Sequence, residues 1–302
     1  MGYINLLLSD SREISIKQSQ LCIINGQGEL RKYPLEDINA VLIENNMLKL
    51  TIYTLSQFME NGIVFYCCDD KHLPQGVMFP LCSQTKSLSV PRLFQEAPKP
   101  LIKRLWQAIV VQKILNQAAV LKFSGKEYGD LQELAKNVSS GDMQNVEAQA
   151  AVIYFKRLFG DNFGRKKENI INSMLNYGYA IVRGAVARTL AVHGYQQSFG
   201  LKHKSVLNSF NLSDDIIEPF RPFVDLYAVK AQVNEDDEGL SREVKRDLLA
   251  LLDKEVVSGE EKHALNYAVE RTVSSLTRSL ESGEASLILP EIVKDAKTHR
   301  YE

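Results

Sequence analysis

The period of the hydrophobic pattern changes once along the chain, and this change constrains the fold more than any single motif. Before residue 82, short β-branched or aromatic runs are separated by turn residues, a pattern typical of strands. After Pro100, apolar residues recur every three or four positions, which is typical of amphipathic helices. We therefore expect an α+β fold of two domains: a small, mostly-β domain and a larger, all-α domain.

Residues 1–82 are predicted to contain several strands and one helix. The strand-like runs are INLLL, ISIKQ, QLCIIN, ELRKYPL, INAVLIE and IVFYCC. A hairpin is expected at Gly26–Gly28, where two glycines flank one residue. Apolar residues at helical spacing over 52–59 predict a helix that ends at Asn61-Gly62. No nucleophile, phosphate loop or ligand cluster stands out in this domain.

Residues 83–100 contain three prolines and several small polar residues, so they are predicted to form a linker. The helical domain is assigned to residues 101–302. Long helices are expected over 101–123, 143–159 and 169–194, with a shorter one over 130–138. Asp130 and Asp142 are predicted N-caps of two of these helices. Two later helices are expected to begin near Ser241 and Lys262.

Composition limits the class of protein. With 45% hydrophobic and 24% charged residues, the 302-residue chain resembles an ordinary globular protein. It has neither an apolar run of about 20 residues nor a basic leader, so we expect a cytoplasmic protein that does not enter a membrane. Residues 101–230 hold 17 Lys and Arg against 11 Asp and Glu, whereas the whole chain has a net charge of −1. A locally basic middle is compatible with a polyanionic partner without demanding one.

The stretch from Lys202 to Asp225 combines a histidine, several carboxylates and an arginine. Asp215 and Glu218 are three residues apart on a predicted helix, so their side chains project from one face. His203 precedes them across a polar loop. An imidazole nitrogen beside carboxylate oxygens is a ligand set that can bind a divalent cation. Simpler interpretations remain open: Asp214 and Asp215 would also suit the first turn of a helix after a Ser cap.

Two further features lie outside that stretch. Glu147 is placed among small and apolar residues on a predicted helix, where a carboxylate needs a partner. On the next long helix, Asn172, Asn176 and Arg183 form an unusual polar series for which a DNA-facing role is a hypothesis. Neither feature is specific alone.

Four ordered motifs together resemble one family. They are EAQAAVIYF at 147–155, NSMLNYGYAIVRGAV at 172–186, GLKHKS at 200–205 and LSDDIIEPFRPFVD at 212–225. The sequence resembles the CRISPR-associated adaptation integrases, metal-dependent endonucleases that insert new spacers into CRISPR arrays. Within that family it is most similar to members of type II systems. The resemblance covers nearly the whole chain.

The resemblance implies a catalytic metal site of Glu147, His203 and Glu218 that holds Mg²⁺ or Mn²⁺. It also implies supporting roles for Asp215 and Arg221. Two departures from the family pattern are Ala148, where many relatives have glycine, and Glu218, where many have aspartate. The basic residues assigned to the DNA backbone are Arg165, Lys166, Lys167, Lys202 and Lys204.

The implied reaction is transesterification, in which the 3′-hydroxyl of a captured DNA fragment attacks a phosphodiester at the leader–repeat boundary. The implied partners are DNA, a second copy of the chain held through the N-terminal domain, and a small ferredoxin-like CRISPR adaptation protein. The RNA-guided effector nuclease is a further implied partner, and the biological setting is antiviral defence. Two alternatives remain open: a stand-alone nuclease that hydrolyses branched DNA, and a non-catalytic DNA-binding scaffold.

Overall fold

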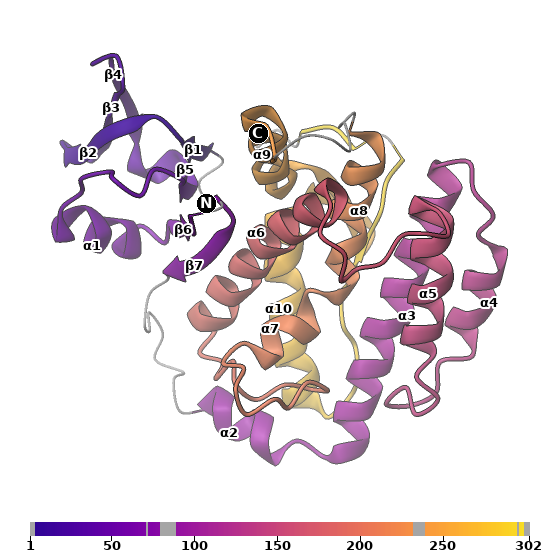
Figure 1. Cartoon of the computed structure of the whole chain (residues 1–302). Coiled ribbons are helices and arrows are strands. Elements are labelled where there is room, and N and C mark those ends of the chain that lie inside the picture. Colours follow the sequence, from indigo (N-terminus) through magenta and orange to yellow (C-terminus); the bar gives the residue numbers. More distant parts are fainter. Residues whose placement is uncertain (1–3, 71, 79–88, 232–238, 295, 299–302) are drawn as a thin grey trace.

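A computed structural model describes residues 4–70, 72–78, 89–231, 239–294 and 296–298. Its N-terminal part is strand-rich, as expected, and its C-terminal part is mainly helical (Figure 1). Within the described residues, every helix is too short or too polar to cross a bilayer.

In the described residues, the N-terminal part contains two sheets, the α-helix α1 and the short 3-10 helix η1. One sheet has the order β1-β5-β6-β7, in which β5 pairs in parallel with both β1 and β6, and β7 is antiparallel to β6. The other sheet is the antiparallel meander β2-β3-β4. The elements are β1 (Ile4–Leu8), β2 (Ser11–Lys17), β3 (Gln20–Asn25), β4 (Leu30–Pro34), η1 (Leu35–Asp37), β5 (Ile38–Ile43), α1 (Ile52–Glu60), β6 (Val64–Cys68) and β7 (Pro74–Met78).

The local sequence explains these elements. The predicted hairpin joins β3 to β4, and the Asn25 side-chain oxygen accepts hydrogen bonds from the backbone N–H groups of Gln27 and Glu29. Every residue of β5 is buried because this strand is central in its sheet. Strand β7 was not predicted, since PQGVM contains Pro and Gly and only one β-branched residue.

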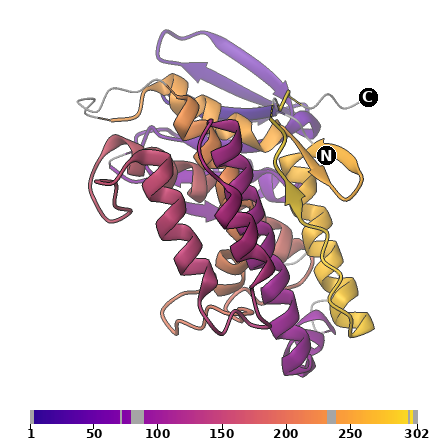
Figure 2. The same cartoon turned by 90° about the vertical axis from the view of Figure 1, so that its right-hand side faces the viewer.

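The helical part surrounds α6, most of whose residues are buried. Helices α3, α4 and α5 pack together on one side of the molecule (Figure 1, Figure 2). The helices are α2 (Ser89–Glu96), α3 (Lys99–Phe123), α4 (Gly129–Lys136), α5 (Val146–Phe159), α6 (Ile170–Val192), α7 (Asn211–Ile216), η2 (Glu218–Phe220), α8 (Arg221–Lys230), α9 (Arg242–Leu249), η3 (Ala250–Asp253) and α10 (Leu265–Ser282).

The expectation of an all-α second domain was wrong in one respect. Strands β8 (Glu255–Ser258), β9 (Glu261–Ala264) and β10 (Pro290–Glu291) form a small antiparallel sheet. Gly259 takes a positive φ of 72° at the turn between β8 and β9, and Val256 is fully buried. The predicted helix start near Lys262 therefore falls within β9, and α10 begins at Leu265.

The predicted linker, residues 83–100, is only partly described. Residues 83–88 lie outside the described residues, whereas Ser89–Glu96 form helix α2. Helix α3 begins at Lys99, and Pro100 is accommodated in its first turn, where a missing N–H costs no helical hydrogen bond.

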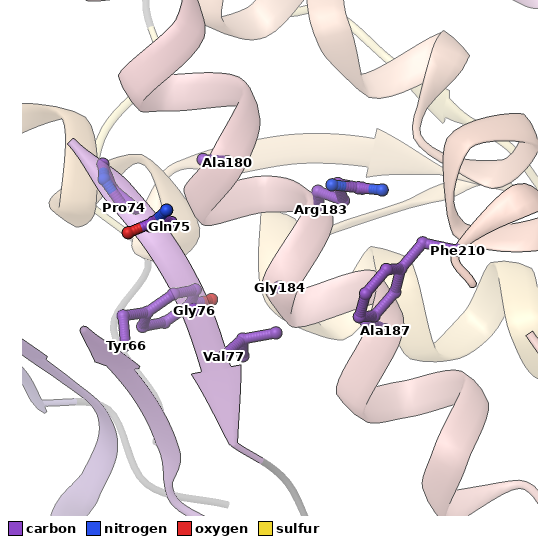
Figure 3. A pocket seen from close by; sticks show the side chains of 10 residues that line it. All are labelled: Tyr66, Pro74, Gln75, Gly76, Val77, Ala180, Arg183, Gly184, Ala187 and Phe210. Atoms are coloured by element: carbon purple, nitrogen blue, oxygen red, sulfur yellow. The ribbon is translucent and has the colours of Figure 1, made fainter. Parts of the chain in front are cut away.

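The four-stranded sheet contacts α6 through Tyr66. The Tyr66 hydroxyl donates a hydrogen bond of 2.7 Å to the carbonyl oxygen of Ile181, in the middle of α6. The ring fits because residue 184 is glycine; a Cβ there would lie 2.2 Å from a ring carbon of Tyr66. Beside this contact, β7 and α6 border a cavity of about 260 Å³ (Figure 3). Helix α6 is thus fixed on one side by the N-terminal sheet.

Candidate active site

Two carboxylates from separate elements converge on one lysine. Oε1 of Glu147, on α5, lies 2.6 Å from Nζ of Lys113, and Oε2 of Glu218, on η2, lies 2.5 Å from the same atom. Lys113 comes from the middle of α3, which contacts both α5 and η2. The side chain of Glu147 is 22% exposed and that of Glu218 only 7%, so the cluster lies at the edge of the core.

Asp142 fixes the start of α5. Its carboxylate accepts hydrogen bonds from the backbone N–H groups of Val146 (2.8 Å) and Glu147 (3.1 Å). It therefore performs the predicted capping, although α5 begins only at Val146 and Asn145 is the residue that precedes it. Because the capped residue is Glu147 itself, the cap also fixes the backbone of the candidate ligand.

The helical segment around Glu218 is interrupted. Pro219 follows this residue, and the short η2 separates α7 from α8, because proline has no N–H to continue the helical hydrogen bonds. Asn116 of α3 donates hydrogen bonds to the carbonyl oxygens of Pro219 (2.8 Å) and Pro290 (2.9 Å), which holds η2 against α3. Glu218 thus occupies a backbone segment that is anchored independently of its own side chain.

The charge of Glu218 is stabilised on both oxygens. Nε of Arg221 lies 2.9 Å from Oε1, opposite the contact of Lys113 with Oε2. Burial acts to raise the pKa of Glu218, but Arg221 and Lys113 outweigh it and hold the pKa at about 2. This carboxylate is therefore ionised at neutral pH.

His203 is held by a buried carboxylate. Its Nδ1 lies 2.7 Å from Oδ1 of Asp215, and the backbone N–H groups of Lys202 (3.0 Å) and His203 (3.2 Å) donate to the same carboxylate. Asp215 has no exposed surface. Its hydrogen bond is the main reason that the pKa of His203 is raised. With Nδ1 engaged, Nε2 is the ring nitrogen that remains for a ligand.

A glycine makes this arrangement sterically feasible. A Cβ at Gly200 would lie 2.3 Å from the carbonyl oxygen of His203 and 2.7 Å from Oδ2 of Asp215. The His203 ring also meets the Trp106 indole of α3 edge-on, with centroids 6.1 Å apart. The loop is therefore packed against α3, one face of which also carries Lys113.

Asp214 lies in the first turn of α7, as one interpretation of the sequence expected. The expected Ser cap was wrong, because α7 begins at Asn211 and Ser213 lies inside it. Oδ1 of Asp214 lies 2.7 Å from Nε of Arg183, and its Oδ2 accepts a hydrogen bond of 2.6 Å from Asn208. Asp130 was likewise predicted as a cap, but α4 begins before it and its carboxylate pairs with Arg157 instead.

A polar cavity of about 340 Å³ opens beside His203. The guanidinium groups of Arg165 and Arg221 lie over the ring of Tyr179, 5.3 Å and 4.7 Å from its centroid. The Tyr179 hydroxyl in turn donates to Asp225. Three arginines therefore face a cavity that includes the candidate histidine. The lining residues are Arg165, Asn176, Tyr179, Ala180, Arg183, His203, Asp214, Ile217 and Arg221.

The polar residues of the series on α6 have two different roles. Asn172 is buried, and its amide donates to the carbonyl oxygens of Gly164 and Lys167, so it shapes the loop before α6. Asn176 and Arg183 instead line the cavity. The DNA-facing hypothesis therefore stays a prediction for Asn176 and Arg183, while Asn172 has a structural role.

The predicted DNA-binding residues lie in two loops. Arg165, Lys166 and Lys167 belong to the loop between α5 and α6, in which Lys166 and Lys167 are exposed. Lys202 and Lys204 flank His203 and are exposed too. Arg165 lies at the cavity beside His203, and both Lys202 and Lys204 line a neighbouring cavity of about 430 Å³ that includes Trp106.

Two participants, Lys113 and Asn116, were not predicted. Lys113 and Asn116 sit on the buried face of α3, and polar residues in such a stripe are the signal that could have found them. Across the parts of the chain that the structure describes, no three or more His, Cys, Asp or Glu side chains are grouped to hold a metal ion. The three-residue metal site thus stays a prediction.

Comparisons with known proteins agree on one family. The family model for CRISPR associated protein Cas1 matches residues 6–238. The chain is 38% identical over 306 aligned residues to a CRISPR-associated endonuclease Cas1 from Neisseria meningitidis serogroup C (strain 8013), with 100% of both chains covered.

Solved structures with a similar fold include a casposase bound to integration product. Its TM-score is 0.78 at 20% identity, and the match covers 95% of this chain and 93% of that one. A chain of a Cas6-RT-Cas1–Cas2 complex is similar with a TM-score of 0.69 at 19% identity, covering 97% of this chain and 36% of that chain. Because both identities are low, these two similarities show only that this chain shares their fold.

Proposed function

Because the chain belongs to the Cas1 family of CRISPR-associated endonucleases, we propose that it is an integrase that inserts spacers into CRISPR arrays. The reaction is attack by the 3′-hydroxyl of a DNA fragment on a phosphodiester at the leader–repeat boundary. The observation that carries the proposal is the convergence of Glu147 and Glu218 on one cationic position. His203, which Asp215 orients, is the third residue assigned to the site.

The two carboxylates offer oxygen ligands of the kind that a divalent ion binds. The Lys113 ammonium stands where the two carboxylates meet, so this position already suits a positive charge. The charge of Glu218 contributes to the raised pKa of His203, after the larger effect of the Asp215 hydrogen bond. Glu147, Glu218 and His203 would hold Mg²⁺ or Mn²⁺, since both ions accept oxygen and imidazole ligands. When bound, the ion supplies Lewis-acid stabilisation of the charge on the reacting phosphate.

The remaining groups position and stabilise the substrate. Asp215 accepts a hydrogen bond from the Nδ1–H group of His203, which leaves the lone pair on Nε2 for an ion. Arg165, Arg183 and Arg221 place three positive charges around the cavity beside His203, where a phosphate would be stabilised. No covalent intermediate on the protein is required, because the attacking and leaving groups are both oxygens of DNA.

Binding of the DNA backbone is assigned to the two basic loops. Lys202 and Lys204 are exposed, flank His203 and line the cavity that includes Trp106. Lys166 is exposed and follows Arg165, which lines the cavity beside His203. The casposase with a similar fold is bound to its integration product, which supports a DNA substrate here. Such contacts are electrostatic and should weaken as salt increases.

The partners are proposed on the same basis. A similar chain occurs in a complex with Cas2, which supports assembly with a second CRISPR adaptation protein; we assign this partner the small ferredoxin-like fold. We further propose that the N-terminal sheets contribute to a homodimer and that the type II effector nuclease joins the complex.

One experiment separates integration from hydrolysis. A duplex with 3′-hydroxyl ends is incubated with the protein, the small partner protein, Mn²⁺ and a supercoiled plasmid carrying a leader and repeat. The proposal predicts covalent joining at the leader–repeat boundary, and no joining with a matched duplex that has 3′-deoxy ends. Plasmid cleavage that is equal with both duplexes would instead identify a stand-alone nuclease.

A further inference from the structure

Lys113 is an unusual buried cation. Only 11% of its side chain is exposed, and its Nζ lies within 2.6 Å of oxygens from both Glu147 and Glu218. Buried lysines are rare because burial of an ammonium group is costly unless it is paired. Here the pairing partners are the same two carboxylates that we assign to a divalent ion.

The two carboxylates need a cation between them. Both point at one Nζ atom, so without it two negative charges would face each other at the edge of the core. The Lys113 ammonium lies between the two carboxylates and contacts an oxygen of each, so its positive charge offsets their repulsion and keeps the pair together.

The oxygens of Glu218 are already engaged. This residue gives Oε1 to Arg221 and Oε2 to Lys113. The Arg221 guanidinium is further held over the Tyr179 ring. Lys113 has a flexible four-carbon stem, and its ammonium is a compact point charge without a fixed bonding plane. Of the two cations on Glu218, Lys113 is the one that can withdraw.

We propose that Lys113 is a built-in counter-cation that holds Glu147 and Glu218 together before a divalent ion binds. The ion must displace the Lys113 ammonium from their oxygens. This inference rests on the metal site of the proposed function, and it makes Lys113 a positioning residue that sets the affinity for the ion. Removing its charge should therefore increase the affinity for the ion and lower the free energy of unfolding of the ion-free protein.

The test is titration of the purified full-length protein with Mn²⁺ by isothermal titration calorimetry. Lys113→Met removes the charge and keeps most of the stem, and Lys122→Met is the control at a more exposed position of the same helix. We expect Lys113→Met to bind Mn²⁺ at least tenfold more tightly than the wild type, and Lys122→Met to match the wild type. Equal or weaker binding by Lys113→Met would overturn the inference.

The outcomes distinguish a failure of this inference from a failure of the proposed function. If neither protein binds Mn²⁺, the metal site and the inference both fail. If both bind equally, only the inference fails. If Lys113→Met does not fold without ions, Mn²⁺ should restore its folded circular dichroism spectrum, because the ion replaces the missing charge. A variant that stays unfolded in saturating Mn²⁺ would also overturn the inference.

Discussion

Nδ1 of His203 lies 2.7 Å from Oδ1 of Asp215, a carboxylate that is completely buried under the loop it orients. Two backbone N–H groups of that loop donate to the same carboxylate, so Asp215 fixes both the ring and the chain that carries it. A carboxylate behind a ligating imidazole is a common device for fixing tautomer and direction.

Asp215→Asn should therefore reduce joining activity by about 10–100-fold. The amide can donate to Nδ1, which would move the imidazole proton to Nε2 and block the nitrogen that binds the ion. Mn²⁺ affinity should fall together with the joining rate, and both are measured on the same preparation. Asp161→Asn, at an exposed position, is the control. Wild-type values for Asp215→Asn would refute this role.

The contact between Tyr66 and α6 predicts a stability effect far from the site. Gly184→Ala introduces a methyl group 2.2 Å from the Tyr66 ring, so the sheet must shift away from α6. Overpacking of this kind costs about 1–3 kcal/mol, which exceeds the gain of about 1 kcal/mol that alanine brings to a helix. Urea denaturation measures the free energy of unfolding, with Ser173→Ala on the same helix as the control. An unchanged or higher value would contradict the described packing.

The buried Asp225 predicts a pH dependence of stability. Burial raises its pKa from the ordinary 3.8 to about 6, although the hydroxyls of Tyr179 and Tyr154 lower it in part. The folded protein therefore binds this proton more tightly than the unfolded chain. The free energy of unfolding should fall as pH rises from about 4 to about 6, and then level off.

The Asp225→Asn variant isolates this contribution. Relative to the variant, the wild type should lose about 1–3 kcal/mol between pH 4 and pH 7. The contribution of Glu218 to stability has the opposite pH dependence and a lower pH range. Its stabilising charge is lost as pH falls from 4.5 towards about 2. Denaturation curves at several pH values provide the measurement. A difference between the two proteins that is the same at both pH values would show that Asp225 is not the group responsible.

The basic loops predict a salt dependence. Each lysine that binds a phosphate of duplex DNA should contribute about 0.9 to the slope of log K against log salt. The double variant Lys166→Gln/Lys204→Gln should thus bind all duplex sequences more weakly, with a slope shallower by about 2. Fluorescence anisotropy over a range of salt concentrations measures this. Lys136→Gln, on α4, is the control, and a slope equal to the wild type would remove the loops from the DNA interface.

Much of the fold could be predicted because long periodic segments carry strong signals. Helices α3 and α6 and the central strand β5 lie where their apolar patterns placed them. Hairpin β8–β9 was not predicted, because each strand has only four residues. A hydrophobic pattern this short does not distinguish a strand from the start of a helix.

The candidate site was only partly accessible from sequence. Glu147, His203 and Glu218 came from a family resemblance, since a local pattern cannot join α5 to η2. Lys113 was not predicted, because a lysine on an amphipathic helix is usually exposed. Its position in the apolar stripe of α3 was a signal of burial, and the packing identifies the two carboxylates that it contacts. The role of Asp214 depended in the same way on Arg183, which approaches it from another helix.

The central claim is that Glu147, His203 and Glu218 act as one ion-dependent site for DNA joining. Its most direct test is the rate of joining in Mn²⁺ for Glu147→Ala, His203→Ala and Glu218→Ala, each checked for a native circular dichroism spectrum. We predict that the rate for every one of these variants falls by at least about 100-fold while DNA binding is retained. A folded variant of any of the three that joins DNA at the wild-type rate would contradict this claim.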